Sequence, residues 1–141
     1  MSDVLYTAEA LSTGGGRNGH VRTTDGRLDM DMAVPKEMGG SGNGANPELM
    51  FAAGYAACFH SAVQGMARAK KVDVTDSSVG SRVQILPNGQ GGFQLAVHLE
   101  VAMPGIERAL AQEIADEAHQ VCPYSNATRG NIEVTVEIVE D

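Results

Sequence analysis

Two cysteines give this chain its most reactive side chains. Cys58 lies in the apolar run LMFAAGYAACF, and Cys122 follows in the segment HQVCPYS. A cysteine in an apolar run often behaves as a small buried hydrophobe. The pair could also form a structural disulfide, contribute to a zinc site or work as a redox couple. The neighbouring residues bear differently on these four alternatives.

Two histidines extend the cysteines to a potential zinc-binding set. Cys58 and His60 are two residues apart on a predicted helix, so their side chains point about 200° apart and cannot readily share one ion. His119 and Cys122 are three residues apart, and their side chains can share one. Zinc therefore stays open as a weaker alternative.

A redox role requires a thiolate, and an apolar site raises the pKa of a thiol unless a nearby cation offsets the desolvation. Arginine suits this task because it stays charged and its planar fork can hold a carboxylate while also addressing a thiolate. Arg17 lies in the loop GGGRNG, whose glycines permit close approach of the backbone. Cys122 lies at the C-terminal end of a predicted helix, where the dipole disfavours a thiolate. Cys58 is therefore the better candidate for attack, and Cys122 for resolution of a sulfenic acid.

Two helices are predicted around these cysteines. The first runs from Asn46, a favourable N-cap followed by Pro47 and Glu48, to about residue 70, and apolar side chains cover nearly its whole circumference. The second spans about residues 105–122, is amphipathic, and ends where Pro123 disfavours helical geometry for the preceding residue. Tyr124 and Ser125 could position the loop of Cys122 or simply cap this helix.

Alternating apolar and polar residues predict the strands. Four segments show this period, at residues 28–34, 79–85, 93–101 and 132–138, and weaker candidates lie at 3–12 and 19–23. The turn Pro87-Asn88-Gly89 joins the two middle strands as a hairpin. We expect a single domain over residues 1–141, of class α+β, with a mainly antiparallel sheet wrapped around a buried central helix. A helix that is apolar all round needs more cover than one such sheet supplies, which favours a homodimer.

Composition excludes some partners and favours one compartment. The formal net charge of −8 argues against nucleic acid or an anionic membrane surface as a partner. The N-terminal sequence lacks a basic segment followed by an apolar core, and no stretch approaches the roughly 18 apolar residues of a spanning helix. We therefore expect a cytoplasmic protein, whose cysteines are more often free, metal-bound or catalytic than permanently crosslinked.

Three segments, in their order and spacing, resemble a known family. They are GGGRNGHVRTTDG, NPELMFAAGYAACFHSA and HQVCPYSNATRGNIEVTV, and together they extend over nearly the whole chain. The sequence resembles the organic hydroperoxide resistance proteins (Ohr) of the OsmC/Ohr superfamily. The Cys-Pro-Tyr-Ser segment favours this branch over the OsmC branch.

The resemblance implies a thiol-dependent peroxidase that reduces organic hydroperoxides, including alkyl and fatty acid hydroperoxides, to alcohols. Cys58 would be the peroxidatic thiol, Cys122 the resolving thiol that forms a Cys58–Cys122 disulfide, Arg17 the activating cation, and Glu48 the carboxylate that orients Arg17. The resemblance also implies an intertwined homodimer with active sites at its interface, no metal or bound cofactor, and recycling by dihydrolipoamide on lipoylated proteins. The alternatives are an OsmC-branch peroxidase and a redox-sensing thiol protein that uses the same disulfide.

One implied contact conflicts with the predicted helix. On an unbroken helix, Glu48 and Cys58 would be about 15 Å apart along the axis, too far for one arginine head to touch both. We therefore predict an interruption of the helix between Glu48 and Cys58: either Gly54 marks a break or bend, or the chain before it is not regular helix. For the substrate, an adaptable apolar pocket could be furnished by the following residues, each of which could instead be core: Met30, Met32, Met50, Phe51 and Phe59.

Overall fold

The computed structural model describes residues 2–140, which fall into two compact units, Met1–Met50 and Phe51–Asp141. The helix α1 (Pro47–Ala69) begins in the first unit and continues into the second. The expectation of one domain over residues 1–141 stays a prediction. Within residues 2–140, no helix is both long enough and apolar enough to span a membrane.

The first unit contains a small antiparallel sheet in the order β1-β2-β3. Its strands are β1 (Ala10–Thr13), β2 (His20–Thr23) and β3 (Asp29–Asp31), with Ala10 opposite Thr23 and His20 opposite Asp31. The weak strand candidate at residues 3–12 is thus a strand only over its last residues. Short 3-10 turns, η1 (Gly16–Asn18) and η2 (Lys36–Met38), complete the unit.

The turn η1 between β1 and β2 carries Arg17. Gly19 makes this turn feasible, because a Cβ there would lie 2.1 Å from the carbonyl oxygen of Thr13. The Asn18 side chain accepts a hydrogen bond of 3.1 Å from the backbone N–H of Val34, which ties the turn to the chain beyond β3. The Arg17 loop is therefore a fixed structure built on close backbone contacts.

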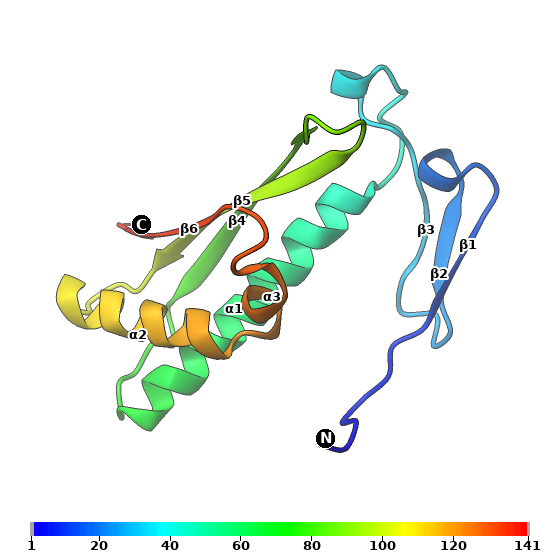
Figure 1. Cartoon of the computed structure of the whole chain (residues 1–141). Coiled ribbons are helices and arrows are strands. Elements are labelled where there is room, and N and C mark those ends of the chain that lie inside the picture. Colours follow the sequence, from blue (N-terminus) through cyan, green and yellow to red (C-terminus); the bar gives the residue numbers. More distant parts are fainter. Residues whose placement is uncertain (1, 141) are drawn as a thin grey trace. The chain divides into compact units, whose positions relative to one another are not determined.

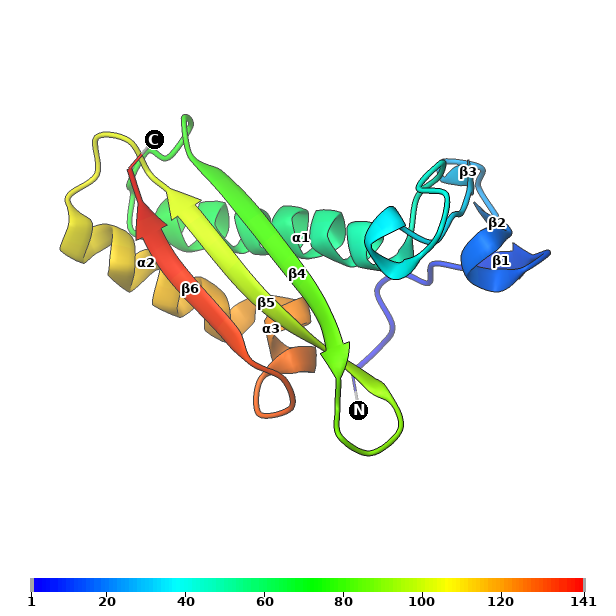
Figure 2. The same ribbon diagram turned by 90° about the horizontal axis from the view of Figure 1, so that it is seen from above.

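The second unit has a three-stranded sheet in the order β4-β5-β6, with helices on one face (Figures 1 and 2). The strands β4 (Ser78–Pro87) and β5 (Phe93–Ala102) form the predicted hairpin, while β6 (Val134–Val139) pairs with β5 in parallel. The helices are α1, α2 (Arg108–Val121) and α3 (Pro123–Thr128). The architecture is α+β, as predicted, and antiparallel apart from the β5–β6 pair.

The boundaries of α1 follow from its sequence. The Asn46 side chain caps the helix by accepting a hydrogen bond of 2.8 Å from the backbone N–H of Leu49, and Pro47 takes the first helical position. The predicted interruption is wrong, because α1 is continuous from Pro47 to Ala69. Its fully buried stripe packs in the core of the second unit with β5 and α2 and consists of Tyr55, Phe59, Val63 and Ala67.

The helix that precedes Cys122 starts later than predicted. Its N-cap is Glu107, whose side chain accepts a hydrogen bond of 3.2 Å from the backbone N–H of Leu110. The Pro104-Gly105 turn before it, with φ +79° at Gly105, is not helical. The predicted end is confirmed, because Val121 is the last helical residue and Cys122 is extended before Pro123.

Candidate functional site

The two cysteines lie side by side in the second unit. Their sulfur atoms are 3.5 Å apart, with both thiols free and the Cys122 thiol placed to donate to the Cys58 sulfur. Cys122 is fully buried, while Cys58 is partly accessible. A disulfide needs a sulfur separation of about 2.0 Å, so a small movement can join them. The two cysteines are 64 positions apart in the chain, and the fold makes them neighbours.

Cys122 is held between two helices. Its backbone N–H bonds the carbonyl oxygen of Ala118 at 2.9 Å as the C-cap of α2, and the same residue is the N-cap of α3. Pro123 then opens α3, a helix that sequence analysis read only as a cap or turn. The switch between helices turns the Cys122 side chain inward toward α1.

Aromatic side chains surround the contact between α1 and α3. The ring of Tyr124 lies 5.7 Å from that of Phe51 and 5.5 Å from that of Tyr55, measured between centroids. Gly54 lies beneath Tyr124, since a Cβ at position 54 would be 2.6 Å from the tyrosine hydroxyl oxygen. Gly54 therefore makes room for Tyr124 and does not break the helix, which corrects the role predicted for it.

The protein environment does not favour a thiolate at Cys58 by itself. Burial raises the pKa of the Cys58 thiol, and a hydrogen bond from the backbone N–H of Tyr124 to the sulfur acts in the opposite direction. The neighbouring Cys122 sulfur raises the pKa further, because two thiolates so close together would repel each other. No cation of residues 51–140 is among the groups that shift this pKa. A reactive thiolate at Cys58 therefore needs a positive charge from elsewhere.

Arg17 and Glu48 form a bidentate ion pair in the first unit. The two guanidinium nitrogens donate to the two carboxylate oxygens at 2.8 and 3.0 Å. The Glu48 side chain is 15% exposed and that of Arg17 is 38% exposed. Hydrogen bonding to Arg17 lowers the pKa of Glu48, and the same hydrogen bonds raise the pKa of Arg17. The pair is thus ionised at neutral pH, with one edge of the guanidinium fixed on the carboxylate.

A chain of buried hydroxyl groups lies behind the cysteines. The Tyr55 hydroxyl is 2.8 Å from Ser125 Oγ and 3.2 Å from Thr128 Oγ1, and His119 Nδ1 is 2.7 Å from the same Ser125 oxygen. Tyr55, Ser125 and Thr128 are at most 5% exposed. From its sequence position, Ser125 was a candidate only for positioning the Cys122 loop or capping the helix, and neither Tyr55 nor Thr128 was predicted to belong to the site. Hydroxyl residues at helical spacing after Cys122, at positions 125 and 128, were the available signal.

An apolar cleft of about 850 Å³ opens beside α3. Its walls come from α1, α3, the β4–β5 hairpin and the loop before β6, and they include Phe51, Phe93, Leu95, Tyr124 and Ile132. Phe51 therefore lines a cleft, as predicted, whereas Phe59 is fully buried in the core and is not among the residues that line this cleft. The predicted pocket residues Met30, Met32 and Met50 belong to the first unit.

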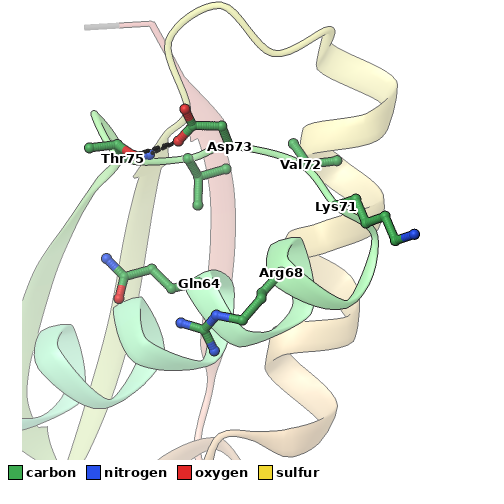
Figure 3. Close-up of a pocket in the computed structure, with 7 residues that line it drawn as sticks. Gln64, Arg68, Lys71, Val72, Asp73 and Thr75 are labelled. Atoms are coloured by element: carbon green, nitrogen blue, oxygen red, sulfur yellow. Dashed lines mark hydrogen bonds between the residues drawn. The ribbon is translucent and has the colours of Figure 1, made fainter.

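A second recess, of about 510 Å³, lies at the C-terminal end of α1 (Figure 3). Gln64 and Arg68 extend toward it from the helix, while Lys71 points away. The loop opposite is closed by Asp73, whose carboxylate accepts hydrogen bonds from the backbone and hydroxyl of Thr75. Neither cysteine lines this recess.

The zinc alternative gains no support from the histidines. His60 Nε2 bonds Ser77 Oγ at 2.9 Å and His119 Nδ1 bonds Ser125, so both rings are engaged with hydroxyl groups. Among the described residues, the three-residue ligand cluster with atoms within 4.8 Å lies elsewhere, on the β4–β6 sheet, and consists of His98, Glu100 and Glu137. Arg82 lies 3.8 Å from Glu100 there and compensates its charge.

A family model described as OsmC-like protein matches residues 40–137. The chain belongs to the OsmC-like family. Curated relatives place this member in its organic hydroperoxide resistance branch. The organic hydroperoxide resistance protein of Xanthomonas axonopodis pv. citri (strain 306) is 50% identical over 139 residues, covering 94% of each chain. The protein OhrB of Bacillus subtilis, with the same description, is 41% identical over 95% of this chain and 98% of its own.

Solved structures of this OsmC-like branch share the fold. An organic hydroperoxide resistance protein from Elizabethkingia anophelis, with thiocyanate bound, superimposes with a TM-score of 0.94 at 45% identity, covering 99% of this chain and 100% of that one. The crystal structure of OhrB from Bacillus subtilis gives a TM-score of 0.87 at 40% identity, covering 96% and 100% of the two chains.

Proposed function

We propose that this protein is a thiol-dependent peroxidase that reduces organic hydroperoxides to alcohols in the cytoplasm. The observation that carries the proposal is the pair of free thiols, 3.5 Å apart, of which Cys58 is accessible and Cys122 is buried behind it. The names of the relatives supply the substrate class, because they are described as organic hydroperoxide resistance proteins. Cys58 is the peroxidatic residue and Cys122 the resolving residue.

The first step is oxidation of Cys58. Its thiolate attacks the terminal peroxide oxygen of ROOH, so that an S–O bond forms and the O–O bond breaks. The alkoxide RO⁻ leaves and takes a proton to become the alcohol ROH, and Cys58 becomes a sulfenic acid. Arginine beside the reacting atoms would stabilise both the thiolate and the charge that develops on the leaving oxygen.

The second step is resolution by Cys122. Its sulfur attacks the Cys58 sulfur, an S–S bond forms, the S–O bond breaks, and the hydroxyl leaves as water with the proton of the Cys122 thiol. A dithiol of the dihydrolipoamide class then reduces the disulfide by thiol exchange and is itself oxidised to a cyclic disulfide. This sequence of steps needs no metal or bound cofactor.

Arg17 is the activating cation in this proposal, and Glu48 orients it. The need for a cation follows from the raised pKa of the Cys58 thiol. Because α1 is continuous, ten residues of helix separate Glu48 from Cys58, a rise of about 15 Å. This rise favours a site in which the Arg17–Glu48 pair of one protomer meets the two cysteines of its partner.

A homodimer also accounts for apolar surface that the single chain leaves open. On α1, Leu49 is 57% exposed, and Ala53 and Ala57 follow it at helical spacing with exposed side chains. Near the N-terminus, Val4, Leu5 and Tyr6 are 79%, 99% and 76% exposed. Exposed apolar stretches of this kind are typical of protein interfaces.

The apolar cleft supports a hydroperoxide with an organic tail over hydrogen peroxide. Tyr124 lines the cleft with its side chain, while its backbone N–H contacts the Cys58 sulfur. Cys58 is not among the residues that line the cleft, so in this proposal Tyr124 connects a tail held against Phe51 and Phe93 with the reacting thiol.

The test is peroxide consumption by the purified protein with dihydrolipoamide, using tert-butyl hydroperoxide and hydrogen peroxide as substrates. We expect turnover that prefers the organic peroxide and is abolished in Cys58→Ser. Arg17→Ala should lose most of the rate, whereas Arg22→Ala, which removes a cation of the neighbouring strand β2, should retain it. Disulfide formation without turnover would favour a redox sensor instead, and equal loss in both arginine variants would contradict the role of Arg17.

A further inference from the structure

The buried hydroxyl chain behind the cysteines connects three helices. His119 belongs to α2, Tyr55 to α1, and Ser125 and Thr128 to α3. Thr128 Oγ1 also lies 2.9 Å from the backbone carbonyl oxygen of Tyr124. The chain of contacts therefore runs from the last turn of α2, across α1, and back to the residue whose N–H bonds the Cys58 sulfur.

One orientation of the protons satisfies every contact in this chain. A carbonyl oxygen can only accept, so the Thr128 hydroxyl donates to Tyr124, and Thr128 must accept from the Tyr55 hydroxyl. Tyr55 in turn accepts from Ser125, and Ser125 accepts from the Nδ1–H of His119. The reverse orientation would leave Thr128 without a hydrogen for the carbonyl oxygen, which would place two acceptors against each other.

The orientation fixes the form of His119. Its Nδ1 must carry a proton, and burial together with the nearby Arg129 charge lowers the pKa of the ring, which favours the neutral Nδ1–H tautomer. Arg129, the C-cap of α3, also donates to the backbone carbonyl of His119, which gives α3 a second hydrogen-bonded link to α2. A buried network with every member satisfied holds its elements in one arrangement.

We propose that His119, Ser125, Tyr55 and Thr128 are positioning residues that hold α3 in register with α1, so that the Cys122 sulfur stays in line with Cys58. The proposal rests on the proposed function of the two cysteines and deepens it. Thr128 also lines the apolar cleft, but the role proposed for the four side chains is not contact with the substrate. They act through α3, which carries the Tyr124 N–H that contacts the Cys58 sulfur and begins at Cys122.

Loss of one link should slow disulfide closure and expose Cys58 to further oxidation. Tyr55→Phe removes a single oxygen atom and keeps the ring, and Ser125→Ala removes the central hydroxyl. Each variant loses hydrogen bonds whose net contribution, if it acts on closure, changes the rate of disulfide closure about fivefold. The Cys58 sulfenic acid would then last longer and be converted in greater part to sulfinic acid by excess peroxide.

The experiment measures disulfide closure in two ways. Stopped-flow kinetics follow closure after one equivalent of tert-butyl hydroperoxide, with intact mass to count sulfinic acid. A parallel series uses diamide, a thiol oxidant that closes the disulfide without a peroxide. We expect about fivefold slower closure in Tyr55→Phe and Ser125→Ala with both oxidants. His119→Leu should behave like them, whereas His119→Asn, which keeps an N–H near the position of Nδ1, should be closer to the wild type.

A matched control separates positioning from stability. Thr135→Val removes another hydroxyl that bonds a histidine Nδ1, that of His98 at 2.5 Å on the β4–β6 sheet, and should leave closure unchanged. Wild-type closure rates in Tyr55→Phe and Ser125→Ala would overturn the inference, as would equal slowing in Thr135→Val. Wild-type protein that closes with diamide but not with peroxide would instead refute the proposed peroxidase function and leave the diamide series to decide the positioning role.

Discussion

Replacement of Gly54 by alanine tests the packing of α1 against Tyr124. Two opposing effects can be compared. Alanine in place of glycine in a helix interior stabilises by about 1 kcal/mol through propensity. The added Cβ would lie 2.6 Å from the Tyr124 hydroxyl oxygen and 3.1 Å from the carbon that bears it, and such overpacking costs about 1 to 3 kcal/mol. We therefore expect Gly54→Ala to give no gain, or a loss of up to about 2 kcal/mol.

A second substitution isolates the clash. Tyr124→Phe removes the nearest atom and leaves ring carbons at 3.1 and 3.3 Å, which small shifts can accommodate. In the Tyr124→Phe background, the gain in helix propensity should exceed the remaining steric cost. Gly54→Ala should then stabilise the protein by up to about 1 kcal/mol. With the full propensity gain in that background, the coupling between the two sites is about 1 to 3 kcal/mol, the cost of the removed clash.

Thermal unfolding of the four proteins at one fixed concentration measures this coupling. For a chain of this length, about 1 kcal/mol corresponds to roughly 3 to 4 °C in Tm. Equal effects of Gly54→Ala in the two backgrounds, within about 0.5 kcal/mol, would refute the contact between position 54 and the tyrosine hydroxyl.

Two further predictions concern ion pairs in the first unit. Because Arg17 lowers the pKa of Glu48, the pair stabilises the fold above the ordinary glutamate pKa, and this stabilisation is lost as the pH falls through the lowered value. Urea unfolding should thus show wild type more stable than Glu48→Gln at neutral pH, with the difference vanishing in acid; a difference that persists at low pH would contradict the pairing. His20 lies between Asp31 and Asp29, whose hydrogen bonds raise its pKa, so its stabilising effect should be complete at low pH and lost as the pH rises through the raised value. NMR titration should place its midpoint above about 6.5 and return it toward that value in the Asp29→Asn and Asp31→Asn double variant.

Local patterns predicted the elements well where one physical signal dominated. Asn46 and Pro47 marked the start of α1, strict alternation marked β4 and β5, and Pro123 marked the end of α2. The start of α2 was misplaced because a proline–glycine turn and an unusual glutamate cap compete with the helical pattern there. The end of an element is therefore more predictable where one local signal marks it than where two signals compete.

Gly54 shows why parts of the site could not be predicted. A glycine within a helical pattern is compatible with a bend or with a close neighbour, and the neighbour is Tyr124, seventy residues later in the chain. The ring of Tyr55 likewise fits any apolar helix face, and only the fold reveals that its hydroxyl meets Ser125 and Thr128. Contacts between segments distant in sequence decide these roles, and such contacts cannot be predicted from the periodicity of apolar residues.

The short gap between the two sulfurs has a consequence for signalling. To pass from 3.5 Å to the about 2.0 Å of a covalent bond, the sulfurs need to approach by only about 1.5 Å. Cys122 is extended between two helices and buried, and a side-chain rotation that closed this gap would leave the outer surface unchanged. The oxidised and reduced forms would then look almost alike to any protein that met them. Such a protein is suited to reduce an oxidant and return to its starting state. It is poorly suited to signalling, because its surface would offer a partner protein little difference between the two forms.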